Sequence, residues 1–384
     1  MVDVLNINKV IKPNRNLING MVNGVMNGNL EHPINEELEN INMVVKNNLS
    51  PRYNVREYLG EGVHGSLYLA EEEDQSGSRE NRSGRRLILK RINMPENANP
   101  EMNHRIKFEL NVLNYLSNDE TTRDYVNPCL AHKMVNNQVL TLFPVFKGYS
   151  LRHLIKYLRQ LTLPEYYKIV FHLIKRILFA MEKIHKNNIA HQNISDNNIL
   201  VSTYDAPSQI KIKLTDFGLG CNQVDPITVP ITNPGLAPNQ IDYFKFSKCR
   251  DKLNIPGKIT AAVLEKLTDI DYLLIAQKYD LFCLGVIFLG LLLRTRIDDK
   301  PEYRSFSPVF IRDIKGNMIR KYLDGGEDTN LLEKEQLGKD QKSDLLEYLD
   351  ILDKYVFCGM ESRRSCRFVL DKIIVYEKYK NDIF

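Results

Sequence analysis

Residues 184–200 read IHKNNIAHQNISDNNIL and residues 214–218 read LTDFG, and these two stretches decide the fold. The first stretch begins at the end of residues 166–185, whose apolar side chains recur at the spacing of an amphipathic or buried helix. The second begins where a short alternating strand over residues 210–214 ends.

A glycine-rich loop lies upstream, where residues 59–67 read LGEGVHGSL inside a strand–turn–strand pattern. Gly60, Gly62 and Gly65 allow a backbone to approach a phosphate closely, and the N–H groups of such a loop can point at the anion. A loop of this kind is equally often a hairpin turn that binds nothing. A dinucleotide-binding fold would need a helix after the third glycine, whereas residues 66–70 continue as a strand.

Lys90 ends the apolar run of a short strand predicted over residues 87–92. A lone lysine on a strand is usually a solvated edge residue, so a functional role for Lys90 requires an acidic partner. The helix predicted over residues 104–116 carries Glu109. Glu101 precedes the apolar periodicity of that helix, so Glu109 is the preferred partner.

The order of these features resembles the protein kinase superfamily: glycine loop, lysine, helix glutamate, catalytic loop and D-F-G motif. Residues 184–200 are similar to the catalytic loop H-R-D-L-x-x-x-N, and the D-F-G motif is unchanged. The resemblance implies that the chain binds ATP and Mg²⁺. Lys90 would grip the phosphates with Glu109 as its ion-pair partner, and Asn198 and Asp216 would be the metal ligands.

The catalytic loop departs from the family pattern at three positions. Asn193 stands where kinases have the aspartate that accepts or orients the proton of the substrate hydroxyl. A neutral amide cannot accept that proton, and a general base contributes about 10²–10⁴ in rate. Ser195 stands where Ser/Thr kinases usually have a lysine that contacts the transferring phosphate. Gln192 replaces an arginine that pairs with a phosphorylated activation loop in many kinases. Asp196 is a weak candidate for a surrogate base, because its register puts it where this loop usually turns away.

The resemblance also implies an adenine site at the connection between two lobes. When residues 148–151, GYSL, are aligned with the G-x-S-L turn of the family, Phe143 falls at the gatekeeper position. Pro144, Val145 and Phe146 then form the hinge. Pro144 has no N–H, but adenine recognition usually uses later backbone groups, so Val145 and Phe146 are the expected contacts.

The predicted fold is α+β and bilobal. A kinase-like domain over residues 51–380 would have a strand-rich N-lobe with one helix over about residues 51–146 and a helical C-lobe over about residues 147–380. Residues 1–50 are rich in asparagine and repeat Asn-Gly steps, which favour turns, so we expect a disordered arm there. The alternative is a docking segment that orders on a partner.

The interval between Asp216 and Asp280 is longer than kinases usually have, which indicates an insert at about residues 239–275. Residues 236–239, LAPN, resemble the A-P-E motif with its glutamate lost, and a second register puts that site near residues 261–264. Both registers remain open. The insert is rich in lysine, tyrosine and phenylalanine, as expected of a solvated loop or of a surface that binds another protein. Downstream, residues 279–285 resemble the acidic start of the buried C-lobe helix.

Composition argues against several classes of protein. A net charge of only +4 argues against wholesale binding to nucleic acid or to an anionic membrane. The six cysteines are scattered, which fits a reducing compartment, the cytoplasm or the nucleus. The longest apolar run, residues 281–293, is shorter than the roughly 20 residues of a membrane span. We therefore expect a buried core helix there, no membrane span, and no signal peptide at the start of the sequence.

Three functions are compatible with this pattern. The first is a pseudokinase, a nucleotide-binding regulator or scaffold that acts through a protein partner. The second is an active Ser/Thr protein kinase with weakened or rearranged chemistry. The third is a kinase-fold enzyme that phosphorylates a small molecule, against which the C-lobe motifs argue mildly.

Overall fold

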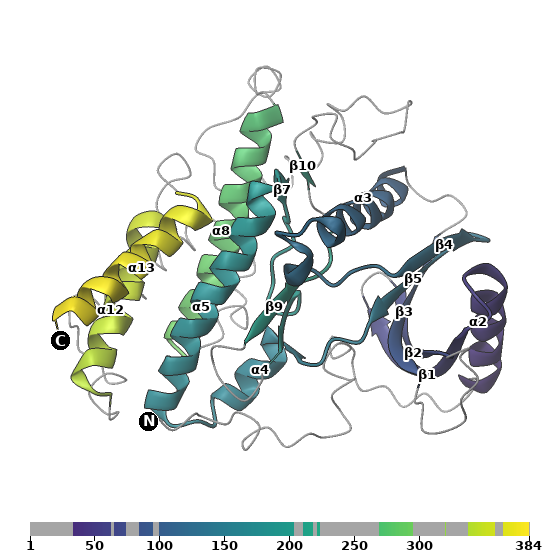
Figure 1. Ribbon diagram of the computed structural model, residues 1–384, viewed down its shortest axis with the longest axis horizontal. Helices are drawn as coiled ribbons and strands as arrows, with labels where there is room; N and C mark the ends of the chain where they lie inside the picture. The colour runs from purple at the N-terminus through teal and green to yellow at the C-terminus, as the bar shows by residue number, and fades with distance from the viewer. Residues whose placement is uncertain are drawn as a thin grey trace.

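The computed structural model describes residues 34–62, 65–73, 84–94, 100–202, 210–217, 221–222, 269–294, 319, 337–357 and 364–383, and the structural statements below concern these residues. A strand-rich region is followed along the chain by a helical region (Figure 1). This arrangement confirms the bilobal α+β fold that the sequence predicts. The predicted insert lies outside the described residues as far as residue 268.

The strand-rich region is built on a five-stranded antiparallel sheet with the order β1-β2-β3-β5-β4. Its strands are β1 (Tyr53–Gly62), β2 (Gly65–Glu72), β3 (Arg85–Asn93), β4 (Ala131–Val135) and β5 (Gln138–Pro144). Successive side chains of β3 point to opposite faces of the sheet, as the pleat requires. Leu87 and Leu89 lie in the cluster that also contains Ile41, whereas Lys90 contacts Glu109.

Two helices accompany this sheet. Helix α3 (Pro100–Asn118) carries Glu109 and packs its apolar side into the large core of the molecule. Helix α2 (Ile34–Asn48) lies on the opposite side of the sheet from α3 (Figure 1). The two helices therefore hold the sheet between them, and each presents a glutamate to β3: Glu109 to Lys90 and Glu37 to Arg91.

Helix α2 corrects the expectation that residues 1–50 form a disordered arm. The Asn-Gly steps are confined to the first 28 residues, and residues 1–33 lie outside the described part of the chain. In α2, Ile41 and Val45 recur at helical spacing and are buried against the sheet. The backbone N–H of Val55 donates to Asn42 Oδ1 at 3.0 Å. The asparagine-rich composition concealed this short amphipathic segment.

Replacing Ile41 with alanine is expected to lower the free energy of unfolding by about 2–4 kcal/mol, because it removes buried methyl groups from a packed core. The matched control is Met43→Ala on the same helix, where the side chain is 59% exposed. Urea denaturation of both variants provides the measurement. Loss of the same size in both variants would contradict the packing of α2 on the sheet.

Within the described residues, the helical region contains five helices of eight residues or more. They are α4 (Leu151–Leu158), α5 (Leu163–Lys186), α8 (Asp269–Leu292), α12 (Lys339–Tyr355) and α13 (Cys366–Ile383). Helix α5 starts at a capping box, in which Thr162 and Glu165 satisfy each other's backbone groups, with a proline in the first turn. These features fix the start of the helix that leads to the loop at residues 191–198.

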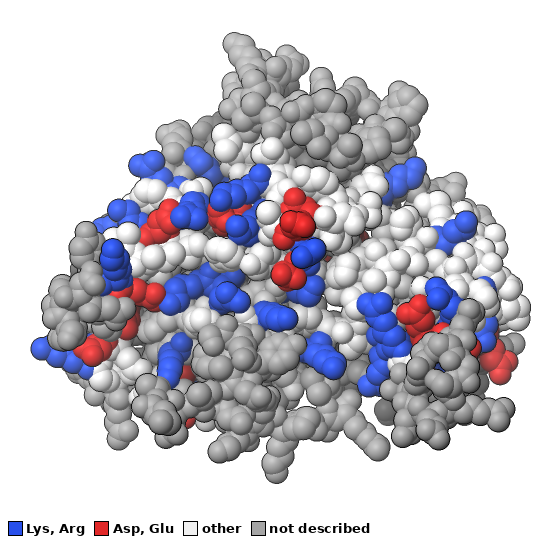
Figure 2. All heavy atoms as spheres, in the orientation of Figure 1, with Lys and Arg blue, Asp and Glu red and all other residues white. Residues whose placement is uncertain are grey.

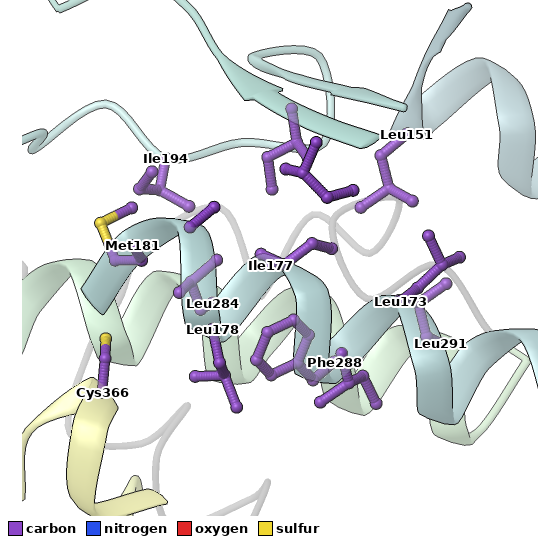
Figure 3. Close-up of a cluster of buried hydrophobic side chains, with 14 of the residues drawn as sticks. Leu151, Leu173, Ile177, Leu178, Met181, Ile194, Leu284, Phe288, Leu291 and Cys366 are labelled. Atoms are coloured by element: carbon purple, nitrogen blue, oxygen red, sulfur yellow. The ribbon is translucent and has the colours of Figure 1, made fainter. Parts of the chain in front are cut away.

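The core of the helical region lies between α5 and α8 (Figure 3). Ile177, Leu178 and Met181 of α5 interdigitate with Leu284 and Phe288 of α8, and all five are fully buried. The apolar run over residues 281–293 is therefore a core helix, as predicted. No helix in the described ranges has both the length and the apolar character that crossing a membrane requires.

Lysine and arginine side chains gather over α5 on the face shown in Figure 2, with acidic side chains among them. At least part of this charge is paired locally: Lys175 Nζ lies 2.7 Å from Glu377 of α13, and Lys186 Nζ lies 2.8 Å from Glu182. Ion pairs that stay partly open to solvent contribute about 0–1 kcal/mol each. The Lys175–Glu377 pair joins α5 to α13, whereas the Lys186–Glu182 pair lies within α5.

Short strands place the loops that follow α5. Strands β6 (Tyr149–Ser150), β8 (Ile199–Ser202) and β9 (Lys211–Leu214) form one sheet, and β7 (Ile189–Ala190) pairs with β10 (Cys221–Asn222). The loop over residues 191–198 connects β7 to β8, and Asp216 follows the end of β9. Because β8 and β9 are antiparallel neighbours, this connection brings Asn198 and Asp216 close together.

Candidate functional site

Residues from both regions meet at one site. Lys90 comes from the central strand β3, Glu109 from α3, Asn193 and Asn198 from the loop between β7 and β8, and Asp216 from the segment after β9. The structure therefore brings together the charged and amide residues that the sequence singles out from stretches more than 120 positions apart.

Backbone conformation and close packing explain why two positions of the β1–β2 hairpin are glycine. Gly60 and Gly65 have φ values of +140° and +143°, which favour glycine. A Cβ at Gly65 would lie 2.0 Å from the carbonyl oxygen of Arg91 on β3. Gly62 pairs with Gly65 at the end of the hairpin, and the strand β2 follows, as expected. The glycines are compatible with a phosphate above the hairpin, but the backbone conformation of Gly60 and the close packing at Gly65 account for these two glycines without one.

Lys90 and Glu109 form an ion pair, with Nζ 3.4 Å from Oε2 and side chains 20% and 12% exposed. Burial alone would lower the pKa of Lys90, but the carboxylates of Glu109 and Asp216 outweigh that effect and raise it. Lys90 is therefore a charged ammonium at neutral pH, held between two acidic groups from different elements.

Asp280 anchors the start of the loop over residues 191–198. It is fully buried, and its carboxylate accepts the backbone N–H groups of His191 and Gln192, each at 2.7 Å. Its Oδ2 also lies 3.0 Å from His185 Nε2. Gln192 has a φ of +56°, a left-handed conformation that costs free energy in a residue other than glycine. The two N–H bonds to Asp280 hold it there.

This role of Asp280 was not predicted from the sequence. The residue was expected at the start of a buried helix, but α8 begins at Asp269 and Asp280 lies within the helix. The available signal was an aspartate surrounded by apolar helical residues, since a buried carboxylate needs hydrogen-bond donors.

His191 links this loop to the segment that carries Asp216. Its Nε2 donates to the carbonyl oxygen of Thr215 at 2.9 Å, and its Nδ1 accepts the N–H of Asn193 at 3.2 Å. This pairing requires the neutral ring. Burial lowers the pKa of His191, so the ring stays neutral at physiological pH. The ring also lies 4.4 Å, centroid to centroid, from the fully buried Phe217.

Two side-chain amides converge on one carboxylate oxygen. Asp216 Oδ2 accepts the amide of Asn193 at 2.5 Å and the amide of Asn198 at 3.4 Å. Asn198 Nδ2 also donates to the backbone oxygen of Asn193 at 2.8 Å. Asp216 has a φ of +67°, and the burial of the adjacent Phe217 fixes this segment. The residue at the expected base position thus binds the expected metal ligand.

Ser195 and Asp196 lie in the turn that follows. The backbone oxygen of Ser195 accepts the N–H of Asn198 at 3.1 Å, and that of Asp196 accepts the N–H of Arg152 at 2.9 Å. These bonds hold the turn against helix α4. The roles suggested for these two side chains remain predictions.

The connection after β5 contains Val145 and Phe146, the two expected adenine contacts. The N–H of Val145 binds the carbonyl oxygen of Arg86 at 3.4 Å, and the carbonyl oxygen of Pro144 accepts from Asn127 at 3.4 Å. Within the described part of the chain, the N–H of Phe146 makes no hydrogen bond, although its carbonyl oxygen accepts from Gly148 at 3.0 Å. Of the two expected adenine contacts, Phe146 alone keeps its donor available. Asn127 carries no motif that would have revealed its contact from sequence.

Comparison with known proteins finds protein kinases. The family model described as "Protein kinase domain" matches residues 53–251, just over half of the chain. The chain is 24% identical over 177 residues to "Probable serine/threonine-protein kinase fhkA" of Dictyostelium discoideum, a match that covers 46% of this chain and 27% of that protein.

Two further relatives match a similar share of the chain. The identity to "Sporulation protein kinase mde3" of Schizosaccharomyces pombe is 29% over 187 residues, which covers 46% of this chain and 31% of that protein. The identity to "Cyclin-dependent kinase 7" of Caenorhabditis elegans is 26% over 175 residues, which covers 44% of this chain and 46% of that protein. The chain therefore spans less than half the length of each of these three relatives.

Proposed function

Since this chain belongs to the protein kinase family, we propose that it is a nucleotide-binding regulator in which the phosphoryl-transfer chemistry of that family is lost or strongly reduced. One observation carries the proposal. The residue at the catalytic-base position is Asn193, and its amide donates a hydrogen bond to Asp216. A neutral amide is not basic enough to take the proton of a substrate hydroxyl, and here its nitrogen is directed at Asp216.

The residues that would hold ATP remain. Lys90 is charged and oriented by Glu109, which suits an ammonium that binds phosphate oxygens. The free N–H of Phe146 suits an acceptor nitrogen of the adenine ring, and the β1–β2 hairpin would cover the phosphates. These contacts support ATP binding without any contribution from the altered catalytic loop.

Of the side-chain oxygens that would bind a metal ion, one is already engaged in hydrogen bonds. Asp216 Oδ1 and Asn198 Oδ1 make no hydrogen bond within the described residues, and both are hard oxygen ligands that fit Mg²⁺. Asp216 Oδ2 is engaged by two amides. A bound Mg²⁺ would neutralise phosphate charge, and these two residues are the ones that would hold it.

The loss of a base limits the chemistry that the loop can support. In active kinases the aspartate of this loop accepts the hydroxyl proton of the substrate, a contribution of about 10²–10⁴ in rate. Because residue 195 is serine rather than lysine, the loop also lacks a positive charge that would contact the transferring phosphate. A protein that binds nucleotide but transfers slowly would act through its conformation, so we propose a protein partner in a reducing compartment, the cytoplasm or the nucleus.

An active Ser/Thr protein kinase is the second candidate. The names of the three relatives describe protein kinases, and the Lys90–Glu109 ion pair is intact. Phosphoryl transfer depends mostly on positioning and electrostatics, which these residues would still supply. Robust transfer to a protein substrate would favour this candidate.

A titration with ATP in the presence of magnesium tests nucleotide binding. Wild-type protein should bind ATP and gain thermal stability, since a ligand that binds the native state stabilises it. Lys90→Met should weaken the affinity about 10–100-fold, because it removes a charge-assisted contact to phosphate. Lys133→Met is the matched control, an exposed lysine of the same sheet, and should behave as wild type. Absence of binding by the wild-type protein would contradict the proposal.

A further inference from the structure

The oxygen Asp216 Oδ2 is the only carboxylate oxygen of the described residues that accepts side-chain amides from two asparagines of one loop, Asn193 and Asn198. At 2.5 Å from a carboxylate oxygen, the nearer atom of the Asn193 amide must be its nitrogen, since two acceptor oxygens at that distance would repel each other. The bond is therefore a charge-assisted one, the stronger kind of hydrogen bond.

The Asn193 amide is fixed in place by its surroundings. Its backbone N–H binds His191 Nδ1, and its backbone oxygen accepts from Asn198 Nδ2. The next residue, Ile194, points into the cluster that contains Met181 of α5 (Figure 3). The loop therefore presents the amide to Asp216 without further ordering, and the contact is pre-organised rather than adventitious.

The charges around Asp216 also favour an amide rather than a carboxylate at residue 193. The charged groups that interact with each other here are Lys90, Glu109 and Asp216, so their formal charges sum to −1. An aspartate in place of Asn193 would make that sum −2 and would put two carboxylates next to each other, an arrangement that a divalent cation relieves. With the amide, the carboxylate of Asp216 already has a donor where a cation would otherwise bind.

We propose that the Asn193 amide takes the place of a divalent cation at Asp216 Oδ2, so that this chain binds ATP and ADP with little dependence on Mg²⁺. The inference rests on the proposed nucleotide site and specifies how that site is regulated. Metal bound through the remaining oxygens of Asp216 and Asn198 would add little affinity, because it would have to share the carboxylate with the amide.

The test is a titration of wild-type protein with a fluorescent ATP analogue, once in magnesium chloride and once in EDTA. The two dissociation constants should agree within about threefold, whereas in Asn193→Ala magnesium should tighten binding by about tenfold, the equivalent of one charge-assisted bond. Asn193→Asp keeps the size of the side chain and should show the largest magnesium effect of the three proteins. Asn197→Ala, at an exposed position of the same loop, should match the wild type.

The outcomes separate this inference from the proposed function. Binding by the wild type in magnesium but not in EDTA would overturn the inference and leave nucleotide binding intact. An equal magnesium effect in wild type, Asn193→Ala and Asn193→Asp would overturn it as well. Absence of binding in both buffers would overturn the inference and the proposed function together.

Discussion

Asn193→Asp is expected to raise the rate of phosphoryl transfer to a protein substrate by about 10²-fold, the lower end of what a general base contributes. The new carboxylate would replace the amide that now donates to Asp216 and would supply an acceptor for the hydroxyl proton. The gain should stay near the lower end because Ser195 still leaves the loop without its cation. Adding Ser195→Lys should raise the rate further.

The recovered activity should require magnesium. In Asn193→Asp two carboxylates would occupy positions that are now 2.5 Å apart as amide nitrogen and carboxylate oxygen, and their repulsion favours a cation between or beside them. Transfer of labelled phosphate from ATP, with magnesium and with EDTA, measures both effects. Asn197→Asp adds the same charge at an exposed site of the loop and should give no gain. Equal rates in Asn193→Asp and Asn197→Asp would show that the amide is not what limits transfer.

Asp280→Ala is expected to lower the free energy of unfolding by about 3–5 kcal/mol, because it leaves buried backbone donors without an acceptor. The N–H groups of His191 and Gln192 would lose the carboxylate that accepts them inside the core, and His185 would lose its carboxylate partner. The left-handed conformation of Gln192 would then lose the hydrogen bond to Asp280 that supports it. The nucleotide site should loosen, since the same loop carries Asn193 and Asn198.

Urea denaturation gives the stability change, and amide hydrogen exchange at residues 191 and 192 reports the loop itself. The control is Asp371→Ala on α13, which removes a carboxylate that pairs with Arg367 at the surface and should cost less than about 1 kcal/mol. Unchanged exchange at residues 191 and 192 in Asp280→Ala would contradict the anchoring role of this carboxylate.

The fold and most contacts of the site follow from local sequence patterns. Alternating strands, a helix with a capping box and an apolar core helix each have a signal within one window of sequence, and each is present. The order of motifs also anticipated that Lys90 would meet Glu109 and that Asn198 would meet Asp216, since strand order and short loops bring these residues together. The domain boundaries at about residues 51 and 380 remain predictions.

What the sequence did not reveal depends on contacts between distant elements. Glu37 of α2 pairs with Arg91 at 2.6 Å and accepts from Tyr68, yet nothing near residue 37 indicates either partner. Burial raises the pKa of Tyr68 to about 12, so its hydroxyl remains a donor to that glutamate. In the same way, the backbone N–H of Val145 donates to the carbonyl oxygen of Arg86. Residue 65 must be glycine because a Cβ there would clash with the carbonyl oxygen of Arg91. Each of these facts needs the register of β3 against its neighbours.

The transfer of labelled phosphate by the unmodified chain tests the central claim most directly. Wild-type protein, incubated with magnesium, labelled ATP and a generic protein substrate, should incorporate no more phosphate than Asp216→Ala does, while the binding titration shows the nucleotide site to be occupied. Robust incorporation that Lys90→Met abolishes would contradict the account, because it would mean that this loop transfers phosphate with an amide at residue 193.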